Sequence, residues 1–250
     1  MSLDLLRDPR SPRAAGYDPA WLVACDRGPN PLWLLEDLSV DLGLRPGMHV
    51  LDLGCGLGAT SVFLVREFGV RVTAVDLHVP PDDVAAQTAR SGVGEWVLPV
   101  RADARALPFA RETFDAIVCI DAWEYFGTAD GYLPYLVGFL RPGCALGVAT
   151  PALRREVREL GGIPPHVRAC VGGEALAWHT PEWWRFQWEA TGLVEVVAAR
   201  CQESGWRDWL TWTRVCAEHG DAAGAAPSLA MLEADGGELL SFALLAARRR

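Results

Sequence analysis

VLDLGCGLGATSVFL, at residues 50–64, is the stretch of this chain that decides its fold. Its apolar start predicts a buried parallel strand, and a helical pattern begins after Gly58. Gly54 and Gly56 permit a tight turn and let a ligand approach the backbone without a Cβ in the way. The free N–H groups at the start of the helix can also bind a ligand at this turn. We therefore expect a ligand site beyond this strand; the alternative is a tight turn that binds nothing.

Strands and helices alternate on both sides of this motif. The predicted strands are residues 48–53, 71–77, 95–103, 114–121 and 144–150. The predicted helices between them are residues 59–68, 81–90 and 131–140, the last with Pro134 as its start or a kink. Near-continuous apolar strands alternating with helices indicate a doubly wound, Rossmann-like α/β sheet that is mostly parallel, with helices on both faces.

The flanking segments complete the predicted domain organisation. Residues 1–42 are expected to form an N-terminal helical segment, with Asn30 capping a helix that begins at Pro31. The main domain is predicted over 43–250, and its Gly- and Pro-rich stretch 151–180 is expected to be a mobile cover. The remaining predicted elements are helix 181–192, strand 193–200, helix 205–220, loop 220–228 and strand 238–247.

Composition excludes several classes of function. All 23 basic residues are arginines, so a Schiff-base lysine, a Walker-loop lysine and a Tyr-x-x-x-Lys pair are impossible. The formal net charge of −9, with scattered arginines, disfavours a nucleic-acid partner. The seven cysteines show no zinc-binding spacing, so we expect reduced thiols and no metal. The lack of a long apolar run predicts neither a membrane span nor a secretory signal, and hence a cytoplasmic protein.

Three aspartates lie at the ends of consecutive predicted strands. GCGLGA alone also fits a dinucleotide-binding fingerprint. However, Asp52 would repel a pyrophosphate and could accept bonds from a cationic amino group. Asp76, about 20 residues further on, can hold both ribose hydroxyls, as in NAD enzymes. Asp103 brings a third carboxylate to the same crevice. An NAD-dependent oxidoreductase remains an alternative, without a recognisable hydride-transfer site.

These segments together resemble a known family. VLDLGCGLGATSVFL, followed by VTAVDL (72–77), RADARALPF (101–109) and FDAIVCIDAWEYF (114–126), is similar to the class I methyltransferases that use S-adenosylmethionine, especially the bacterial small-molecule branch. The resemblance is specific over residues 48–150. It implies S-adenosylmethionine as cofactor, S-adenosylhomocysteine as product, and a seven-stranded sheet of order 3-2-1-4-5-7-6 with an antiparallel last strand.

The resemblance also implies which residues hold the cofactor. They are Asp52, Gly54 and Gly56 around the methionine moiety, Asp76 at the ribose, and Leu77, Asp103 and the backbone N–H of Ala104 at the adenine. Asp121 ends the fourth strand, where the family brings cofactor and acceptor together. The Asn-Pro-Pro-Tyr sequence of amino-methylating DNA enzymes is absent here, which disfavours a nucleobase target and leaves a small-molecule acceptor, with O- or N-methylation expected.

Four residues are candidates for a general base. His179 precedes the helix expected to flank the substrate mouth, and histidine has the most suitable intrinsic pKa. The alternative is a structural histidine at the start of a helix. Glu124 and Asp121 follow strand four directly; a solvated loop acid is the alternative for Glu124. His166 lies in the predicted cover.

Tryptophan is unusually frequent between residues 178 and 212. Helical spacing predicts that most of these rings pack the core. Trp21, Trp123 and Trp178 are the candidates for an aromatic wall that binds a flat or cationic acceptor. A SAM-binding regulatory protein without catalysis and a lipid-modifying SAM enzyme are alternative functions, and both a monomer and a homodimer are compatible with the sequence.

Overall fold

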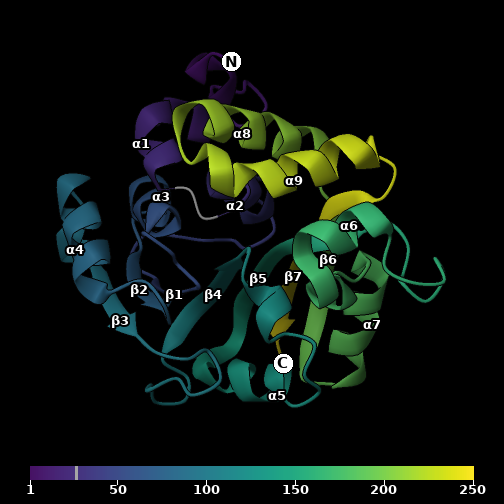
Figure 1. The fold of residues 1–250 in the computed structure, drawn as a ribbon. Coiled ribbons are helices and arrows are strands. Elements are labelled where there is room, and N and C mark those ends of the chain that lie inside the picture. Colours follow the sequence, from purple (N-terminus) through teal and green to yellow (C-terminus); the bar gives the residue numbers. More distant parts are fainter. Residues whose placement is uncertain (26–27) are drawn as a thin grey trace.

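The computed structural model describes residues 1–25 and 28–250, and a single sheet lies at its centre (Figure 1). The strands are β1 (His49–Leu53), β2 (Arg71–Asp76), β3 (Val97–Arg101), β4 (Phe114–Ile120), β5 (Leu140–Leu153), β6 (Val194–Cys201) and β7 (Leu240–Arg249). Their order is β3-β2-β1-β4-β5-β7-β6. The first five strands pair in parallel, and β7 is antiparallel to both β5 and β6. The predicted sheet is confirmed.

The strand register aligns the carboxyl ends of the first four strands. Leu53 of β1 pairs with Val75 of β2, and Asp76 pairs with Arg101 of β3. On the other side of β1, Asp52 pairs with Val118 of β4. The segments that follow these strands therefore emerge along one edge of the sheet, where parallel α/β proteins bind ligands.

Two helical layers cover the sheet. One core contains α1 (Pro19–Ala24), α2 (Pro31–Ser39), α3 (Ala59–Phe68), α4 (Pro81–Arg90), α6 (Pro165–Val171), α8 (Gly205–His219) and α9 (Ala222–Asp235). The other contains α5 (Tyr132–Leu136) and α7 (Pro181–Ala190). Along β1, Val50 faces the first core and Leu51 the second, as the alternation of a strand requires. Burial of these apolar side chains is the main favourable term in folding.

Several helix boundaries lie where the sequence predicts them. Helices α3 and α4 span the predicted ranges 59–68 and 81–90. The side chain of Asn30 accepts the backbone N–H groups of Leu32 and Trp33, so it caps α2 before Pro31. These ends were predictable because a cap and a proline are local signals. Residues 1–42 are helical in part, and α2 shares the core of the sheet.

The predicted loop at 220–228 is wrong. This stretch begins α9, and the Asp221 side chain accepts the N–H groups of Ala223 and Gly224 at its start. Pro227 lies in the second turn of the helix, where it removes one intrahelical hydrogen bond. Met231 and Leu232, one to two turns later, are buried. Burial of Met231 and Leu232 stabilises α9. The glycine and proline near the start of this helix are typical of a loop, so the sequence did not indicate a helix there.

The predicted cover has more regular structure than its composition indicates. Strand β5 continues to Leu153, which pairs with Leu240 of β7. The segment then contains α6 and a 3-10 helix, Gly172–Ala177. Val167 and Ala175 are fully buried, so both elements pack on the core. Within the described ranges, no helix combines the length and apolarity needed to cross a membrane.

Candidate active site

The glycine turn after β1 is fixed by its contact with β2. The backbone N–H groups of Gly54 and Cys55 both donate to the carbonyl of Val75, at 2.8 and 3.0 Å. Gly54 has φ +79°, and a Cβ there would lie 2.4 Å from the Cβ of Ala122. Gly56 also has a positive φ, +52°. Glycine is therefore required at position 54 both by its backbone conformation and by the close approach of the segment after β4.

Asp76 is held in one orientation at the end of β2. One carboxylate oxygen accepts the N–H of Gly56 at 3.0 Å. The other accepts the N–H groups of His78 and Val79 at 2.7 and 2.9 Å. A carboxylate oxygen has two lone pairs, so the oxygen that accepts the Gly56 N–H keeps one lone pair for a ligand, whereas the other oxygen already accepts two N–H groups. The fixed carboxylate can accept a ribose hydroxyl at the free position.

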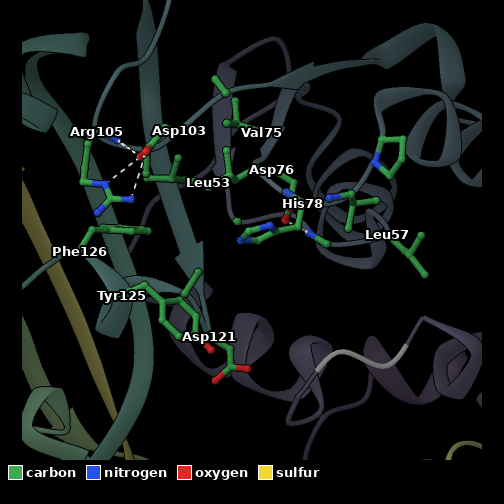
Figure 2. A pocket seen from close by; sticks show the side chains of 18 of the residues that line it. Leu53, Leu57, Val75, Asp76, His78, Asp103, Arg105, Asp121, Tyr125 and Phe126 are labelled. Atoms are coloured by element: carbon green, nitrogen blue, oxygen red, sulfur yellow. Dashed lines mark hydrogen bonds and ion pairs between the residues drawn. The ribbon is translucent and has the colours of Figure 1, made fainter. Parts of the chain in front are cut away.

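A cavity of about 750 Å³ opens beyond these strand ends. Seven of the predicted cofactor residues line it: Gly54, Gly56, Asp76, Leu77, Asp103, Ala104 and Asp121. Figure 2 shows Asp76 and His78 on one side, Asp103 with Arg105 on another, and Asp121 beside Tyr125. This volume suits a nucleoside-sized ligand. We call it the first cavity.

Asp103 is paired with Arg105 at the cavity wall (Figure 2). Its carboxylate accepts the Arg105 guanidinium at 2.9 and 3.1 Å and the Arg105 backbone N–H at 2.8 Å. These hydrogen bonds lower the pKa of Asp103. An adenine amino group would therefore share this carboxylate with Arg105. Sequence reasoning missed Arg105, although the Asp-x-Arg spacing after β3 was a signal for this pair.

Asp52 does not line the first cavity. It is 1% exposed, and one carboxylate oxygen accepts the hydroxyls of Thr60 and Ser61 at 2.7 and 2.6 Å. Burial raises its pKa to about 6. The hydroxyls in the first turn of α3 draw the side chain behind the glycine turn. Asp52 thus anchors α3 to β1 in this structure, and its contact with the methionine moiety stays a prediction.

Asp121 lies in a strained position directly after β4. Its φ is +56°, in the left-handed region that side chains rarely adopt, and its N–H donates to Ala149 at 2.8 Å. A Cβ on Gly28 would lie 2.1 Å from an Asp121 carboxylate oxygen. Backbone strain of this kind is concentrated at functional sites. The chain therefore holds Asp121 against Gly28 at the edge of the first cavity.

A second cavity, of about 330 Å³, adjoins the first. Asp121 and Tyr125 line both cavities. The second cavity also receives side chains from η4 (Trp123–Tyr125), from the cover, and from α8 and α9, among them Glu124, Glu174, Trp178 and Trp209. Figure 1 shows α8 and α9 lying together above the sheet. We call it the second cavity.

Glu124 is a buried carboxyl group in the wall of the second cavity. The residue is 5% exposed, and its carboxylate accepts the hydroxyl of Thr150 at 2.9 Å. Burial raises its pKa to about 7, with the nearby charge of Glu174 adding to the rise. A solvated loop acid, the alternative interpretation, does not fit this burial. A carboxyl that titrates near neutral pH can accept a proton from a ligand.

Neither candidate histidine is among the described residues that line the two cavities. His179 stacks on Trp183 with ring centroids 3.5 Å apart, and its Nδ1 lies 2.8 Å from a Glu156 oxygen. His166 bonds Asp235, joining α6 to α9 at 3.2 Å. His179 thus packs and bonds at the start of α7, and its role as a general base stays a prediction.

The three candidate tryptophans lie in different environments. Trp178 lines the second cavity. Trp123 is fully buried against Trp184 and Trp188, at 6.3 and 5.6 Å between ring centroids. Trp21 stacks on Tyr17 at 5.7 Å and is not among the described cavity residues. Instead, Trp209 and Trp212 join Trp178 in the second cavity. The spacing of Trp209 and Trp212 predicted that they share one face of a helix. It could not predict that this face lines the second cavity.

Comparison with known proteins agrees with this geometry. Residues 50–157 match the family model of the methyltransferase domain. Residues 50–157 therefore correspond to a methyltransferase domain. Over 140 residues it is 31% identical to a sterol 24-C-methyltransferase from Yarrowia lipolytica, which covers 55% of this chain and 36% of that protein. Over 122 residues it is 32% identical to the methyltransferase GfsG of Streptomyces halstedii, covering 48% and 44% respectively.

The fold of the methyltransferase domain also matches solved structures. Geranyl diphosphate C-methyltransferase from Streptomyces coelicolor A3(2), solved with S-adenosylhomocysteine, superimposes with a TM-score of 0.69 at 19% identity. The match covers 86% of this chain and 76% of that one. This likeness concerns the fold. The matched region spans less than half the length of the two curated relatives.

Proposed function

We propose that this protein transfers a methyl group from S-adenosylmethionine to an oxygen or nitrogen of a small-molecule acceptor. The observation that carries the proposal is the junction of the two cavities at Asp121 and Tyr125. The first cavity has the residues for the cofactor, and the second has room for an acceptor beside it. A methyl donor and its acceptor must meet in this way because the reaction is a direct displacement.

The residues of the first cavity fit the cofactor. Gly54 and Gly56 leave space for the methionine moiety along the backbone, and Asp76 is oriented to accept a ribose hydroxyl. Leu77 lines the region expected for the adenine, with Asp103 and Ala104 offering polar contacts. When bound, S-adenosylmethionine supplies a methyl group that is already activated by its sulfonium.

The protein contributes position and proton transfer. Fixing two reactants in a productive geometry can supply roughly 7–11 kcal/mol in favourable intramolecular models. The walls of the second cavity exclude water and orient the acceptor. Glu124 can take a proton from a neutral hydroxyl or an ammonium acceptor, a role that typically contributes about 10²- to 10⁴-fold. We infer a small-molecule acceptor in part because the described wall of this cavity has no basic side chain to bind a phosphate backbone.

Calorimetric titration tests the cofactor assignment. We expect S-adenosylmethionine and S-adenosylhomocysteine to bind the wild-type protein, and NAD and NADP not to bind. Asp76→Ala should lose this binding, whereas Asp130→Ala, at an exposed aspartate outside the first cavity, should keep it. Binding of NAD in place of the S-adenosyl compounds, or their unchanged binding to Asp76→Ala, would overturn the proposal.

A further inference from the structure

The second cavity is acidic. Carboxylates from four places line it: Asp121 after β4, Glu124 in η4, Glu174 in the cover and Asp221 at the start of α9. Among the described residues of its wall there is no arginine or histidine. The first cavity differs, because Arg105 and His78 contribute to its wall. An acidic wall lowers the free energy of a bound cation and raises that of an anion.

Glu124 and Glu174 make the strongest contribution to the negative charge of the wall of the second cavity. Both belong to the wall of a cavity lined largely by apolar side chains, where water screens charge poorly. Burial raises the pKa of Glu174 as well as that of Glu124. Two carboxyl groups that are both costly to ionise are stabilised most by a positive charge placed between them. Thr150 donates one hydrogen bond to Glu124 but brings no charge.

Aromatic rings also line the second cavity. Trp178 and Trp209 have ring centroids 5.8 Å apart, and Trp209 packs on Phe242 at 4.8 Å, which fixes its orientation. Trp178 is 2% exposed, and its indole N–H lies close enough to the Glu174 carboxyl group to lower the pKa of that group, against the rise that burial causes.

We propose that the second cavity binds a small organic cation, a protonated primary or secondary amine, as the methyl acceptor. The inference rests on the proposed function, because it names the acceptor class of that same site. Tryptophan rings in the wall favour a cation through their negative ring surface, and the carboxylates of Glu124 and Glu174 accept the ammonium N–H groups. A volume of about 330 Å³ accommodates an amine with an attached ring.

Glu124 then has a second role. An ammonium nitrogen has no lone pair, so it must lose a proton before it can act as a nucleophile. The ammonium N–H bond breaks, its electron pair stays on nitrogen, and the proton goes to a Glu124 carboxylate oxygen. The neutral amine remains in the cavity beside the junction at Asp121 and Tyr125. Recognition and activation of the acceptor thus use the same carboxylate.

Three matched probes test the inference by calorimetry on protein saturated with S-adenosylhomocysteine. N-methylbenzylamine is the cation, benzyl methyl ether its neutral counterpart of the same shape, and phenylacetate an anion of similar size. At about pH 8, where the amine is protonated and Glu124 is ionised, we expect the amine to bind about tenfold more tightly than the ether, or better. Phenylacetate should bind more weakly than both.

Variants locate the binding. Glu124→Gln should weaken amine binding about tenfold and leave ether binding unchanged. Glu174→Gln, at a less buried position, should also weaken amine binding. It is the deciding variant if Glu124→Gln does not fold. Glu189→Gln, on the exposed face of α7, is the control and should change nothing.

The outcomes separate the two proposals. If S-adenosylhomocysteine does not bind, the proposed function fails. If it binds but the ether or phenylacetate equals the amine, or both cavity variants keep full amine affinity, the cationic acceptor is wrong and the proposed function stands.

Discussion

At the scale of single residues, Gly54 is the position where the smallest change has the clearest consequence. An added Cβ would meet Ala122 at 2.4 Å and would require a strained φ of +79°. We expect Gly54→Ala to lose about 2–4 kcal/mol of unfolding free energy, from overpacking plus backbone strain, and to lose S-adenosylhomocysteine binding. Denaturant unfolding and calorimetry measure the two effects.

Gly47→Ala is the matched control for this substitution. Gly47 has φ +84°, but nothing lies within 4 Å of an added Cβ. It should therefore cost about 1 kcal/mol from the backbone alone and keep ligand binding. Equal effects of the two substitutions would show that the contact between the glycine turn and Ala122 is unimportant.

Glu124 predicts a dependence of stability on pH. Its pKa is raised from an ordinary 4.5 to about 7, so the folded state holds a proton that the unfolded state releases. The contribution of Glu124 to stability is then complete below pH 4.5 and is lost as pH rises to about 7. The charged or titratable groups around it are Glu174, Asp121, Tyr125 and Cys119.

Glu124→Gln isolates this effect, since glutamine resembles the protonated acid. We expect the variant and the wild type to be equally stable near pH 4, and the variant to be more stable by about 2–3 kcal/mol near pH 8. The pKa of Asp52 is also raised, but Asp52 is present in both proteins, so its contribution to the pH dependence of stability cancels in the comparison. Urea denaturation across this range gives the comparison. A stability difference that does not change with pH would contradict the assignment.

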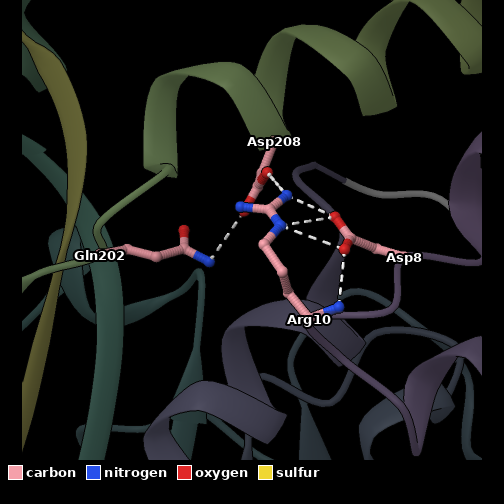
Figure 3. A network of polar contacts seen from close by, with 4 residues as sticks. All are labelled: Asp8, Arg10, Gln202 and Asp208. Atoms are coloured by element: carbon pink, nitrogen blue, oxygen red, sulfur yellow. Dashed lines mark hydrogen bonds and ion pairs between the residues drawn. The ribbon is translucent and has the colours of Figure 1, made fainter.

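At the scale of elements, the N-terminal segment is tied to α8 by one arginine (Figure 3). Arg10 forms ion pairs with Asp8 and with Asp208 of α8, and Asp208 also accepts a bond from Gln202 at 3.5 Å. These contacts raise the pKa of Arg10. Because Trp209 and Trp212 of α8 line the second cavity, this tie also supports the acceptor site.

Removing this tie should loosen the segment without unfolding the protein. Arg10 is half exposed, so we expect Arg10→Ala to cost only about 1 kcal/mol and to speed amide hydrogen exchange over residues 3–16. Arg185→Ala, which breaks the exposed pair with Glu189 on α7, should leave exchange in that segment unchanged. Unaltered exchange in Arg10→Ala would mean that other contacts hold the segment.

The cover at 151–180 stays a predicted mobile element. Its α6 and the 3-10 helix that follows pack on the core, yet Glu174 and Trp178 reach the second cavity. We expect amide exchange over residues 165–177 to slow when cofactor and acceptor are both bound. The same exchange rates with and without the ligands would exclude a mobile cover.

The same elements show what the sequence could and could not predict. Helices α3 and α4 were predicted to the residue because caps and prolines act locally. The start of α9 was missed because its stability comes from packing against α8 and α6, with Met231 and Leu232 buried. At the site, Asp76, Asp103 and Asp121 follow directly from strand ends. The orientation of Asp52 did not, since the hydroxyls that it bonds lie eight and nine residues further on, in the first turn of α3.

At the scale of the whole molecule, the topology explains why the two cavities meet. Strands β1, β2 and β3 bring the cofactor residues to one edge of the sheet, and β4 ends beside them at Asp121. The second cavity is assembled from segments near residues 28, 124, 174, 209 and 228, which approach one another only in the folded chain. No local sequence signal could predict it.

A crystal structure with S-adenosylhomocysteine tests the proposed function most directly. We expect the ribose hydroxyls at Asp76, the adenine near Leu77 and Asp103, and the sulfur at the junction lined by Asp121 and Tyr125, open to the second cavity. A ligand bound elsewhere, or a sulfur directed away from the second cavity, would contradict methyl transfer at this site.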